Sequence, residues 1–317
     1  MKVLIADNID QEAVDILKKE FEVTSKEVSP NELLDIIHTF DAIIVRSRTK
    51  VTSDVINKGI KLKAIARAGI GVDNIDVEVA SSKKIPILFA PQGSTISVAE
   101  LTIGVILSLI RKINVANESM KNGLWEKKSF KGTELYGKSL GLIGSGRIGT
   151  EVAKRCLAFG MKIQSYDPYI SEEIAKKNNI SLVESLDQLL STSDIVSIHA
   201  LLTEETKNMI DYDKLKLMKP SSYLINISRG GIINENDLIR ALKESLISGA
   251  ALDVYQDEPL PKTSPLREKS LPLILTPHIG ASTSEAQNRA GLIVVDDIIK
   301  VLKGNKPTFC VNPQVLH

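Results

Sequence analysis

The chain has 317 residues, 43% hydrophobic and 25% charged, which is the composition of an ordinary globular protein and enough for two domains. Its 40 Lys and Arg residues balance 39 Asp and Glu residues, so the overall charge favours neither a nucleic-acid partner nor a membrane partner. The most apolar stretch, 101–110, is about half as long as a membrane span, and residues 1–7 do not resemble a signal peptide. The two cysteines lack metal-ligand spacing, so we expect a cytoplasmic protein without a metal site.

Short β-branched runs alternate with helical patterns in the first part of the chain. Runs of this kind are typical of parallel strands buried on both faces, and they lie at 2–6, 21–24, 42–46, 64–68 and 87–90. Amphipathic stretches such as 11–19 and 31–37 lie between them. The alternation predicts βαβ units, and therefore an open, doubly wound α/β sheet.

A long helical stretch, about 97–122, leads to a second series of six runs. They lie at 139–144, 162–167, 194–199, 222–228, 250–254 and 273–276, and they match a full dinucleotide-binding sheet. A last amphipathic helix, about 283–303, is expected to fold back onto the first domain. We therefore expect two doubly wound α/β domains: a Rossmann domain over 97–283, inserted into a flavodoxin-like domain formed by 1–96 and 284–317.

A glycine-rich turn, Gly144-Ser145-Gly146-Arg147-Ile148-Gly149, follows an apolar run and opens a helix. Gly144 permits the tight turn, Gly146 allows a diphosphate to approach the backbone, and Gly149 lets the helix pack on the strand. The helix N-terminus offers N–H groups to the phosphates. Asp167, at the end of the next run, can bind the ribose hydroxyls and would repel a 2′-phosphate, so we expect NAD as cofactor. The alternative is a structural turn that binds nothing.

Three polar residues follow later strands of this second series. Arg229 comes after the run 222–228, Glu258 after 250–254 and His278 after 273–276. Parallel strands end at a common edge, where ligands of open α/β sheets bind. Histidine can move the hydroxyl proton of a hydroxy acid, a carboxylate can orient the imidazole, and arginine can hold the substrate carboxylate. Any one of the three by itself could equally be an ordinary turn or loop residue.

Several stretches carry a resemblance to the D-isomer-specific 2-hydroxy acid dehydrogenases, namely 67–76, 119–125, 132–135 and 280–287. The resemblance implies that Arg229, Glu258 and His278 are the catalytic set and that Arg147 and Ile148 contact the cofactor diphosphate. It also implies cofactor contacts at Ala200, Ile227, Ser228, Asp253, Gly280 and Ala281. Ile70 departs from the family pattern, because relatives often have a small hydroxyl residue there.

Within the family, the chain most resembles members that oxidise D-3-phosphoglycerate to 3-phosphohydroxypyruvate in serine biosynthesis. This implies a small phosphorylated hydroxy acid as substrate, with Gly69 and Gly71 in the loop that holds its carboxylate. Arg46 and Arg67 are the candidates for its phosphate, the alternative being solvated arginines at strand ends. A homodimer formed through 97–135 is also implied. Since the chain ends soon after the last helix, feedback by serine through a C-terminal regulatory domain is not expected.

Two other functions remain open at this point. One is another activity within the family, such as that of a glyoxylate/hydroxypyruvate reductase or of a dehydrogenase for D-lactate or a bulkier acid. The other is an NAD-sensing binding protein like the transcriptional corepressors that share this fold. A panel of hydroxy and keto acids separates these possibilities.

Overall fold

The computed structural model describes residues 1–316, so the predicted segment 284–317 extends one residue beyond the described part. The chain divides into two compact units. Unit 1 comprises residues 1–97 and 281–316, and unit 2 comprises 98–280, which is therefore inserted into the chain of unit 1. Each helix found within residues 1–316 is too short or too polar to span a lipid bilayer.

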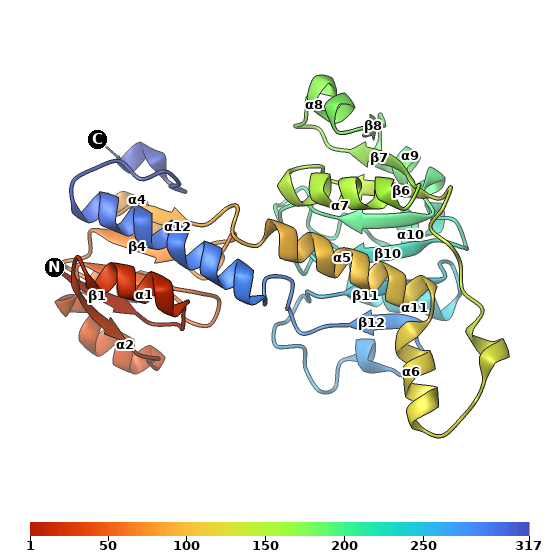
Figure 1. Cartoon of the computed structure of the whole chain (residues 1–317), viewed down its shortest axis with the longest axis horizontal. Helices are drawn as coiled ribbons and strands as arrows, with labels where there is room; N and C mark the ends of the chain where they lie inside the picture. Colours follow the sequence, from red (N-terminus) through yellow and green to blue (C-terminus); the bar gives the residue numbers. More distant parts are fainter. Residues whose placement is uncertain (317) are drawn as a thin grey trace. The chain divides into compact units, whose positions relative to one another are not determined.

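Unit 1 is built on a parallel sheet of five strands in the order β2-β1-β3-β4-β5, which is the flavodoxin-like order. The strands are β1 (Lys2–Ile5), β2 (Glu22–Ser25), β3 (Ala42–Val45), β4 (Ala64–Arg67) and β5 (Ile87–Phe89). The helices are α1 (Gln11–Lys18), α2 (Pro30–Ile36), α3 (Ser53–Lys58), α4 (Val77–Ser82) and α12 (Ser284–Leu302), with 3-10 turns η1 (Ile37–Thr39) and η4 (Pro313–Val315). Figure 1 shows α1 and α12 side by side over this sheet.

Successive side chains along the strands of unit 1 pack into two separate cores, one beneath each layer of helices. In β3, Ile44 joins the core under α1 and α12, whereas its neighbour Ile43 joins the core under α2, α3 and α4. Successive side chains of a strand point to opposite faces, so a strand buried on both faces needs an unbroken apolar run. The continuous apolar runs of the sequence therefore correspond to central strands covered by helices on both sides.

The segment after α12 covers the outer edge of β5. Asn312, which is buried, accepts the backbone N–H of Ile87 at 2.8 Å and donates to the carbonyl oxygen of Ile85 at 3.0 Å. Cys310 forms an antiparallel bridge with Leu88, and the rings of Phe309 and Phe89 meet edge to face. These contacts pair an edge strand that would otherwise expose hydrogen-bonding groups.

Unit 2 is built on a parallel sheet of seven strands in the order β12-β11-β10-β9-β6-β7-β8. The strands are β6 (Ser139–Ile143), β7 (Lys162–Tyr166), β8 (Ser181–Leu182), β9 (Ile195–Ile198), β10 (Tyr223–Asn226), β11 (Gly249–Leu252) and β12 (Leu273–Leu275). The helices are α5 (Thr95–Ile110), whose first residues belong to unit 1, α6 (Ile113–Lys121), α7 (Arg147–Ala158), α8 (Glu172–Lys177), α9 (Leu186–Thr192), α10 (Tyr212–Leu217) and α11 (Glu235–Lys243), with 3-10 turns η2 (Lys127–Phe130) and η3 (Pro265–Arg267). The strand order reverses between β6 and β9, which is where doubly wound sheets bind their ligands.

The predicted fold of two doubly wound α/β domains is confirmed, with two local differences. A seventh strand, β8, was not predicted, because its two residues are too short to produce an alternating pattern. The single helix expected over 97–122 is instead two helices, α5 and α6. Lys112 between them has a left-handed backbone with φ of 55°, which ends α5 although the apolar spacing continues.

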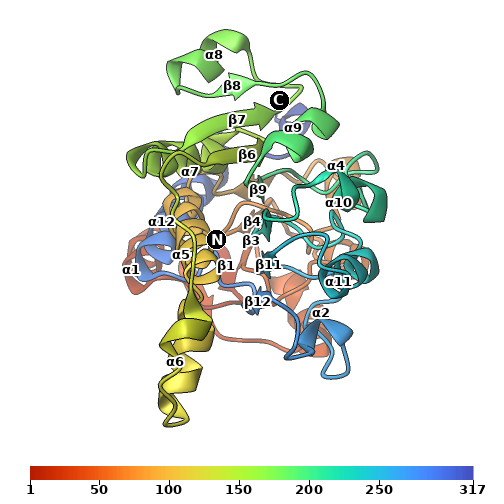
Figure 2. The ribbon, with the colours of Figure 1, turned by 90° about the vertical axis from the view of Figure 1, so that its right-hand side faces the viewer.

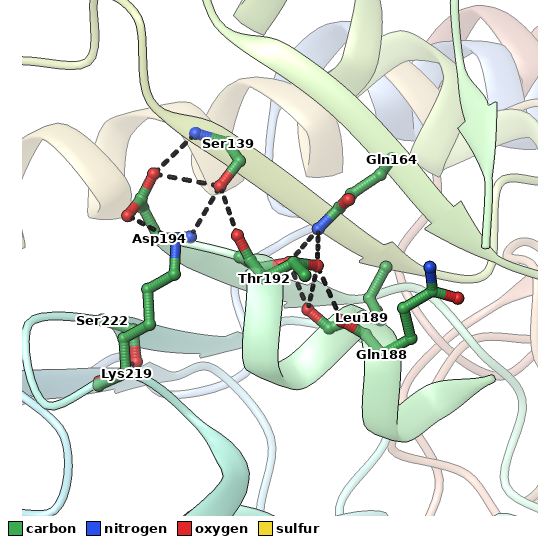
Figure 3. A network of polar contacts seen from close by, with 9 residues as sticks. Ser139, Gln164, Gln188, Leu189, Thr192, Asp194, Lys219 and Ser222 are labelled. Atoms are coloured by element: carbon green, nitrogen blue, oxygen red, sulfur yellow. Dashed lines mark hydrogen bonds and ion pairs between the residues drawn. The ribbon is translucent and has the colours of Figure 1, made fainter. Parts of the chain in front are cut away.

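A polar network joins the N-terminal ends of β6, β9 and β10 and connects β7 to α9 (Figure 3). The carboxylate of Asp194 accepts the backbone N–H of Ser139 at 2.8 Å and the ammonium of Lys219 at 3.0 Å. The side-chain amide of Gln164 donates to the hydroxyl of Thr192 at 2.7 Å. Because the strands are parallel, this edge is opposite the one from which the glycine turn leaves β6. The network is therefore part of the scaffold and not of the ligand site.

Candidate active site

The glycine turn of unit 2 has the geometry that its sequence predicts. Gly144 has φ of +89°, and a Cβ there would lie 2.8 Å from the carbonyl oxygen of His199. A Cβ on Gly149 would collide with the carbonyl oxygen of Gly144, so α7 packs directly on the turn. A Cβ on Gly146, by contrast, would meet nothing within 4 Å. Two of the glycines are therefore needed by the fold, and the third faces open space.

The N-terminus of α7 has no side-chain cap, because the residue at the N-cap position is Gly146. The N–H groups of the first turn therefore lack the hydrogen bond that Ser or Asp supplies at most helix starts. Arg147 is exposed and Ile148 half-buried at the same end. An uncapped helix end beside an open glycine is a cradle that fits a diphosphate. The residues present thus fit a dinucleotide.

Asp167 lies directly beside the glycine turn. Its Oδ2 accepts the backbone N–H of Ser145 at 2.7 Å and the Ser145 hydroxyl at 3.2 Å, and its Oδ1 accepts the backbone N–H of Tyr169 at 3.0 Å. A carboxylate has about four acceptor positions, so these three bonds orient the group and leave capacity for a ribose hydroxyl. The carboxylate both stabilises the turn and lies where the sequence predicts a cofactor contact.

His199 lies beneath the same turn, at the end of β9. Burial lowers the pKa of its imidazole to about 4, and its Nε2 is 2.9 Å from the Ser197 hydroxyl. An imidazole with this pKa is neutral at physiological pH. Its backbone carbonyl also limits the space at Gly144. His199 is therefore a neutral support of the turn, while the adjacent Ala200 is only partly buried at the strand end.

The loop that carries Arg229 is shaped by Asn226, the last residue of β10. Asn226 is buried; its amide donates to the carbonyl oxygen of Arg229 at 2.9 Å and accepts from the backbone N–H and hydroxyl of Ser228. The guanidinium of Arg229 donates to the carbonyl oxygen of Ser228 at 2.7 Å. Ile227 is buried. Sequence reasoning did not single out Asn226, because a strand-ending asparagine has no distinctive pattern.

The loop that carries His278 is shaped by Asp253, which follows β11 and is buried. One oxygen of Asp253 accepts the Thr276 hydroxyl at 2.6 Å and the Ile279 N–H at 2.8 Å, and the other accepts the Gly280 N–H at 2.8 Å. The resemblance implied a cofactor contact for Asp253. That contact stays a prediction; what the structure shows is that Asp253 bonds residues before and after His278 and so shapes its loop.

His278 and Glu258 form a direct pair. Nδ1 of His278 is 2.7 Å from Oε2 of Glu258, and Oε1 of Glu258 accepts the backbone N–H of Tyr255 at 3.0 Å. The hydrogen bond to Glu258 raises the pKa of His278, although burial of the ring opposes this; Asp253 adds to the rise and Arg229 reduces it. Burial would raise the pKa of Glu258, but the bonds from His278 and Tyr255 outweigh burial and lower it.

The backbone of His278 is itself unusual. Its φ is +53°, in the left-handed region that non-glycine residues rarely occupy. Such a conformation costs about 1–3 kcal/mol and persists only where neighbouring contacts maintain it. The bonds from Asp253 to both flanks of His278 are contacts of that kind. The imidazole is therefore held in one direction by the fold of unit 2.

The substrate candidates of the first domain lie in unit 1, at the carboxyl ends of β3 and β4. Arg67 donates from Nε to Asn74 Oδ1 at 3.1 Å, and its guanidinium lies over Gly69, where a Cβ would collide with it. Gly71 follows in the same loop. Arg46 makes a long bond of 3.3 Å from its guanidinium to the carbonyl oxygen of Asn8. Unit 1 and unit 2 thus each carry one group of candidates, and Ala281, the last of the cofactor candidates, begins the second segment of unit 1.

A third arginine of unit 1, Arg48, has a structural role. Its Nε lies 3.0 Å from a carboxylate oxygen of buried Asp7, and its guanidinium donates to the carbonyl oxygen of Ala6 at 2.7 Å. Asp7 also accepts the N–H of Arg46 and the hydroxyl of Thr49. No pattern in the sequence distinguishes Arg48 from Arg46, since only the fold decides which guanidinium meets Asp7. No group of His, Cys, Asp and Glu that could hold a metal occurs among residues 1–316.

The sequence of this chain matches one described protein family and several named proteins. The family model described as "D-isomer specific 2-hydroxyacid dehydrogenase, NAD binding domain" matches residues 103–280. The D-3-phosphoglycerate dehydrogenase of Methanocaldococcus jannaschii is 48% identical over 98% of this chain and 59% of its own length. A hydroxypyruvate reductase of Thermotoga maritima is 47% identical over 95% of this chain and 98% of its own length. The chain thus spans about three fifths of several of the curated relatives that it matches.

Solved structures are similar over the whole chain. The TT0316 protein of Thermus thermophilus has a TM-score of 0.88 at 32% identity, covering 98% of this chain and 100% of that one. A D-lactate dehydrogenase from Aquifex aeolicus, complexed with NAD and lactic acid, has a TM-score of 0.84 at 29% identity, covering 98% and 99%. The match of residues 103–280 to the NAD-binding-domain model and the likeness to the Thermotoga maritima relative, covered over 98% of its length, show that the chain belongs to the D-isomer specific 2-hydroxyacid dehydrogenase family.

Proposed function

We propose that this chain catalyses the NAD-dependent oxidation of a D-2-hydroxy acid, and the reverse reduction, with His278 as the acid/base. The observation that carries the proposal is the 2.7 Å contact between His278 Nδ1 and Glu258 Oε2. A carboxylate at Nδ1 fixes the tautomer and stabilises the imidazolium, so that Nε2 is the atom that exchanges a proton with the substrate. NAD, when bound, supplies the hydride acceptor.

In the oxidative direction, neutral His278 accepts the proton of the C2 hydroxyl. Glu258 stabilises the imidazolium that results. The guanidinium of Arg229 binds the substrate carboxylate, for which its planar pair of donors is suited. Its positive charge also stabilises negative charge that develops on the C2 oxygen. In the reductive direction, His278 starts protonated and returns the proton.

The acid/base assignment is tested by His278→Asn, with NADH absorbance as the readout. Loss of general acid–base catalysis lowers turnover by about 10²–10⁴-fold. The matched control is His38→Asn, because His38 is an exposed histidine of unit 1. NADH binding, followed by fluorescence, should be retained in both variants. Near-normal turnover by His278→Asn would refute the assignment.

We propose D-3-phosphoglycerate as the substrate, oxidised to 3-phosphohydroxypyruvate as in serine biosynthesis. Support comes from the relatives named D-3-phosphoglycerate dehydrogenase at 42–48% identity. Support also comes from Arg46, whose guanidinium makes one long bond of 3.3 Å and so can reorganise around a phosphate at low cost. Arg67 is the second phosphate candidate, and the loop with Gly69 and Gly71 offers backbone N–H groups to the carboxylate.

Hydroxypyruvate reduction is the second candidate. It is favoured by the Thermotoga maritima relative, because that protein is 47% identical and is matched over 98% of its own length. Hydroxypyruvate lacks the phosphate, so it does not need Arg46. The two candidates differ in one group of the substrate, and a single charge change can therefore separate them.

The substrate experiment measures kcat/KM for 3-phosphoglycerate, glyoxylate, hydroxypyruvate and a branched 2-keto acid, in the wild type and in Arg46→Gln. If Arg46 binds the phosphate, loss of a charge-assisted hydrogen bond lowers kcat/KM about tenfold to hundredfold for the phosphorylated substrate alone. Lys50→Gln is the matched control, because Lys50 is an exposed cation of the same loop. An equal loss on all substrates would contradict the phosphate assignment. A wild type that prefers hydroxypyruvate would establish the second candidate.

We also propose that the chain forms a homodimer through the region 97–135. Figure 2 shows α6 and the segment that follows projecting from the sheet of unit 2. Large apolar side chains on this arm are exposed, among them Ile113, Met120, Leu124 and Trp125, the last at 80%. Exposed apolar groups gathered in one region are typical of interfaces. Light scattering should give twice the chain mass for the wild type and less for Trp125→Glu; a monomeric wild type would refute the dimer.

A further inference from the structure

A second carboxylate, Glu235, lies close to the pair formed by His278 and Glu258. It is the first residue of α11, and its Oε1 accepts the backbone N–H of Gln256 at 2.6 Å. Burial raises the pKa of Glu235, and the nearby charges of Asp257 and Glu258 add to the rise. A carboxyl group half-buried next to two others is unfavourable unless it makes a specific contact. The contact it makes is with the segment that carries Glu258.

The segment 256–258 needs such an anchor. Gln256, Asp257 and Glu258 are all exposed, whereas Tyr255 before them is buried, with its hydroxyl 2.7 Å from the carbonyl oxygen of Thr276. Glu258 accepts the N–H of Tyr255 with one oxygen and meets His278 with the other. The Gln256 N–H is therefore a point where an exposed turn is attached to a helix of the scaffold.

The loop after β10 restricts the same segment from another side. A Cβ on Gly230 would collide with the carbonyl oxygen of Tyr255, so the backbone that follows Arg229 packs directly on the backbone that leads to Glu258. Four residues further along, Asn234 caps α11 by accepting the N–H of Asp237 at 3.2 Å. Glu235 thus belongs to the short connection that starts at Arg229 and ends in α11.

We infer that Glu235 is a positioning residue: by holding the Gln256 N–H, it sets the place of Glu258 and through it the direction of the His278 imidazole. Glu235 acts on Glu258 and His278 through the backbone of 256–258, whose Gln256 N–H it accepts. This inference rests on the proposed function for its kinetic consequence. Its structural consequence, a change in the pKa of the His278 imidazole, can be measured without any substrate.

Two conservative variants of Glu235 separate the effect of side-chain length from the effect of charge. Glu235→Gln keeps an oxygen at the same distance and loses the charge, whereas Glu235→Asp keeps the charge and withdraws it by one methylene. If position is what matters, Glu235→Gln retains near-wild-type kcat, and Glu235→Asp loses about tenfold to hundredfold in kcat, since a displacement of about 1 Å has that effect on an active group. The KM for NAD should be unchanged. Asp237→Asn is the control for loss of an acidic residue in the first turn of α11.

The second readout is the titration of the His278 imidazole by NMR, which needs no turnover. The charged groups that face His278 are Glu258, Asp253 and Arg229, and those near Glu235 are Asp257 and Glu258. We expect the His278 pKa to fall toward its ordinary value in Glu235→Asp and to stay raised in Glu235→Gln and Asp237→Asn. The same change should appear as a shift of the pH profile of kcat/KM to lower pH.

The inference is overturned if Glu235→Asp keeps both the wild-type His278 titration and the wild-type kcat, or if Glu235→Gln shows the same loss as Glu235→Asp. It is also overturned if Asp237→Asn reproduces the loss. A wild type that oxidises none of the hydroxy acids tested would refute the proposed function but leave the NMR result to decide on Glu235. Circular dichroism of each variant verifies that it is folded.

Discussion

The most demanding prediction concerns Asp253→Asn in the loop of His278. Asp253 is 1% exposed and accepts three donors, two at one oxygen and one at the other. An asparagine has one acceptor oxygen, which serves the Thr276 hydroxyl and the Ile279 N–H; its NH₂ then faces the buried Gly280 N–H. One charge-assisted bond is lost and one buried donor is left unpaired, so the free energy of unfolding falls by about 2–4 kcal/mol.

Stability is measured by thermal unfolding, with circular dichroism as the signal. The melting temperature of a domain of about 150–250 residues changes by about 2–4 °C per kcal/mol, so the melting temperature of Asp253→Asn should be about 5–15 °C below that of wild type. Turnover should also fall, because the left-handed backbone of His278 is maintained by these bonds; a displacement of about 1 Å costs about a hundredfold. The control is Asp257→Asn, an exposed carboxylate nearby whose unfolding free energy should change by less than about 0.5 kcal/mol. An Asp253→Asn protein as stable as this control would refute the reasoning.

Three further predictions concern pH and the scaffold. Glu258 raises the pKa of His278, so kcat/KM for oxidation should rise with pH through a value above 6.5, and kcat/KM for reduction should fall over the same range. Glu258→Gln should move both pH profiles to lower pH. Profiles that do not move would exclude the pair as the titrating group. Gly144→Ala places a methyl group 2.8 Å from the His199 carbonyl oxygen at a φ of +89°, so we expect a loss of at least about 1–3 kcal/mol in unfolding free energy and weaker NADH binding, measured by denaturation and fluorescence titration. Burial would raise the pKa of Asp194, but the hydrogen bonds that this carboxylate accepts outweigh burial and lower the pKa below 3.8. The ionised carboxylate therefore stabilises the fold above pH 3.8, and this stabilisation is lost as the pH falls through the lower folded pKa. Asp194→Asn should be less stable than wild type at pH 7, and the difference in stability should shrink in acid.

The same linkage applies to the acid/base pair with opposite signs for its two members. The raised pKa of His278 stabilises the fold fully below 6.5 and loses its effect as pH rises through the folded value. The lowered pKa of Glu258 stabilises above 4.5 and loses its effect as pH falls through the folded value. Both side chains are more than a third exposed, at 46% and 35%, so solvent screens the pair and its effect on stability is small.

Features that depend on neighbours along the chain were predictable from sequence. The apolar runs predicted all strands except β8, because a strand buried on both faces must be apolar throughout and a two-residue strand has no pattern. The turn from Gly144 to Gly149 was predicted because its steric needs fall on residues at short spacing. The break at Lys112 was not predicted, since a left-handed lysine leaves no mark in the apolar spacing.

The sequence by itself therefore determined the two α/β domains, the dinucleotide turn with Asp167, and the residue types needed for proton transfer. Only the tertiary structure decided which polar groups meet: Asp253 with the loop of His278, Glu235 with Gln256, Asn226 with the loop of Arg229, and Arg48 with Asp7. The physical reason is that backbone sterics and hydrophobic period act over a few residues, whereas a hydrogen bond between strand-end loops exists only after the sheet has brought those loops to one edge.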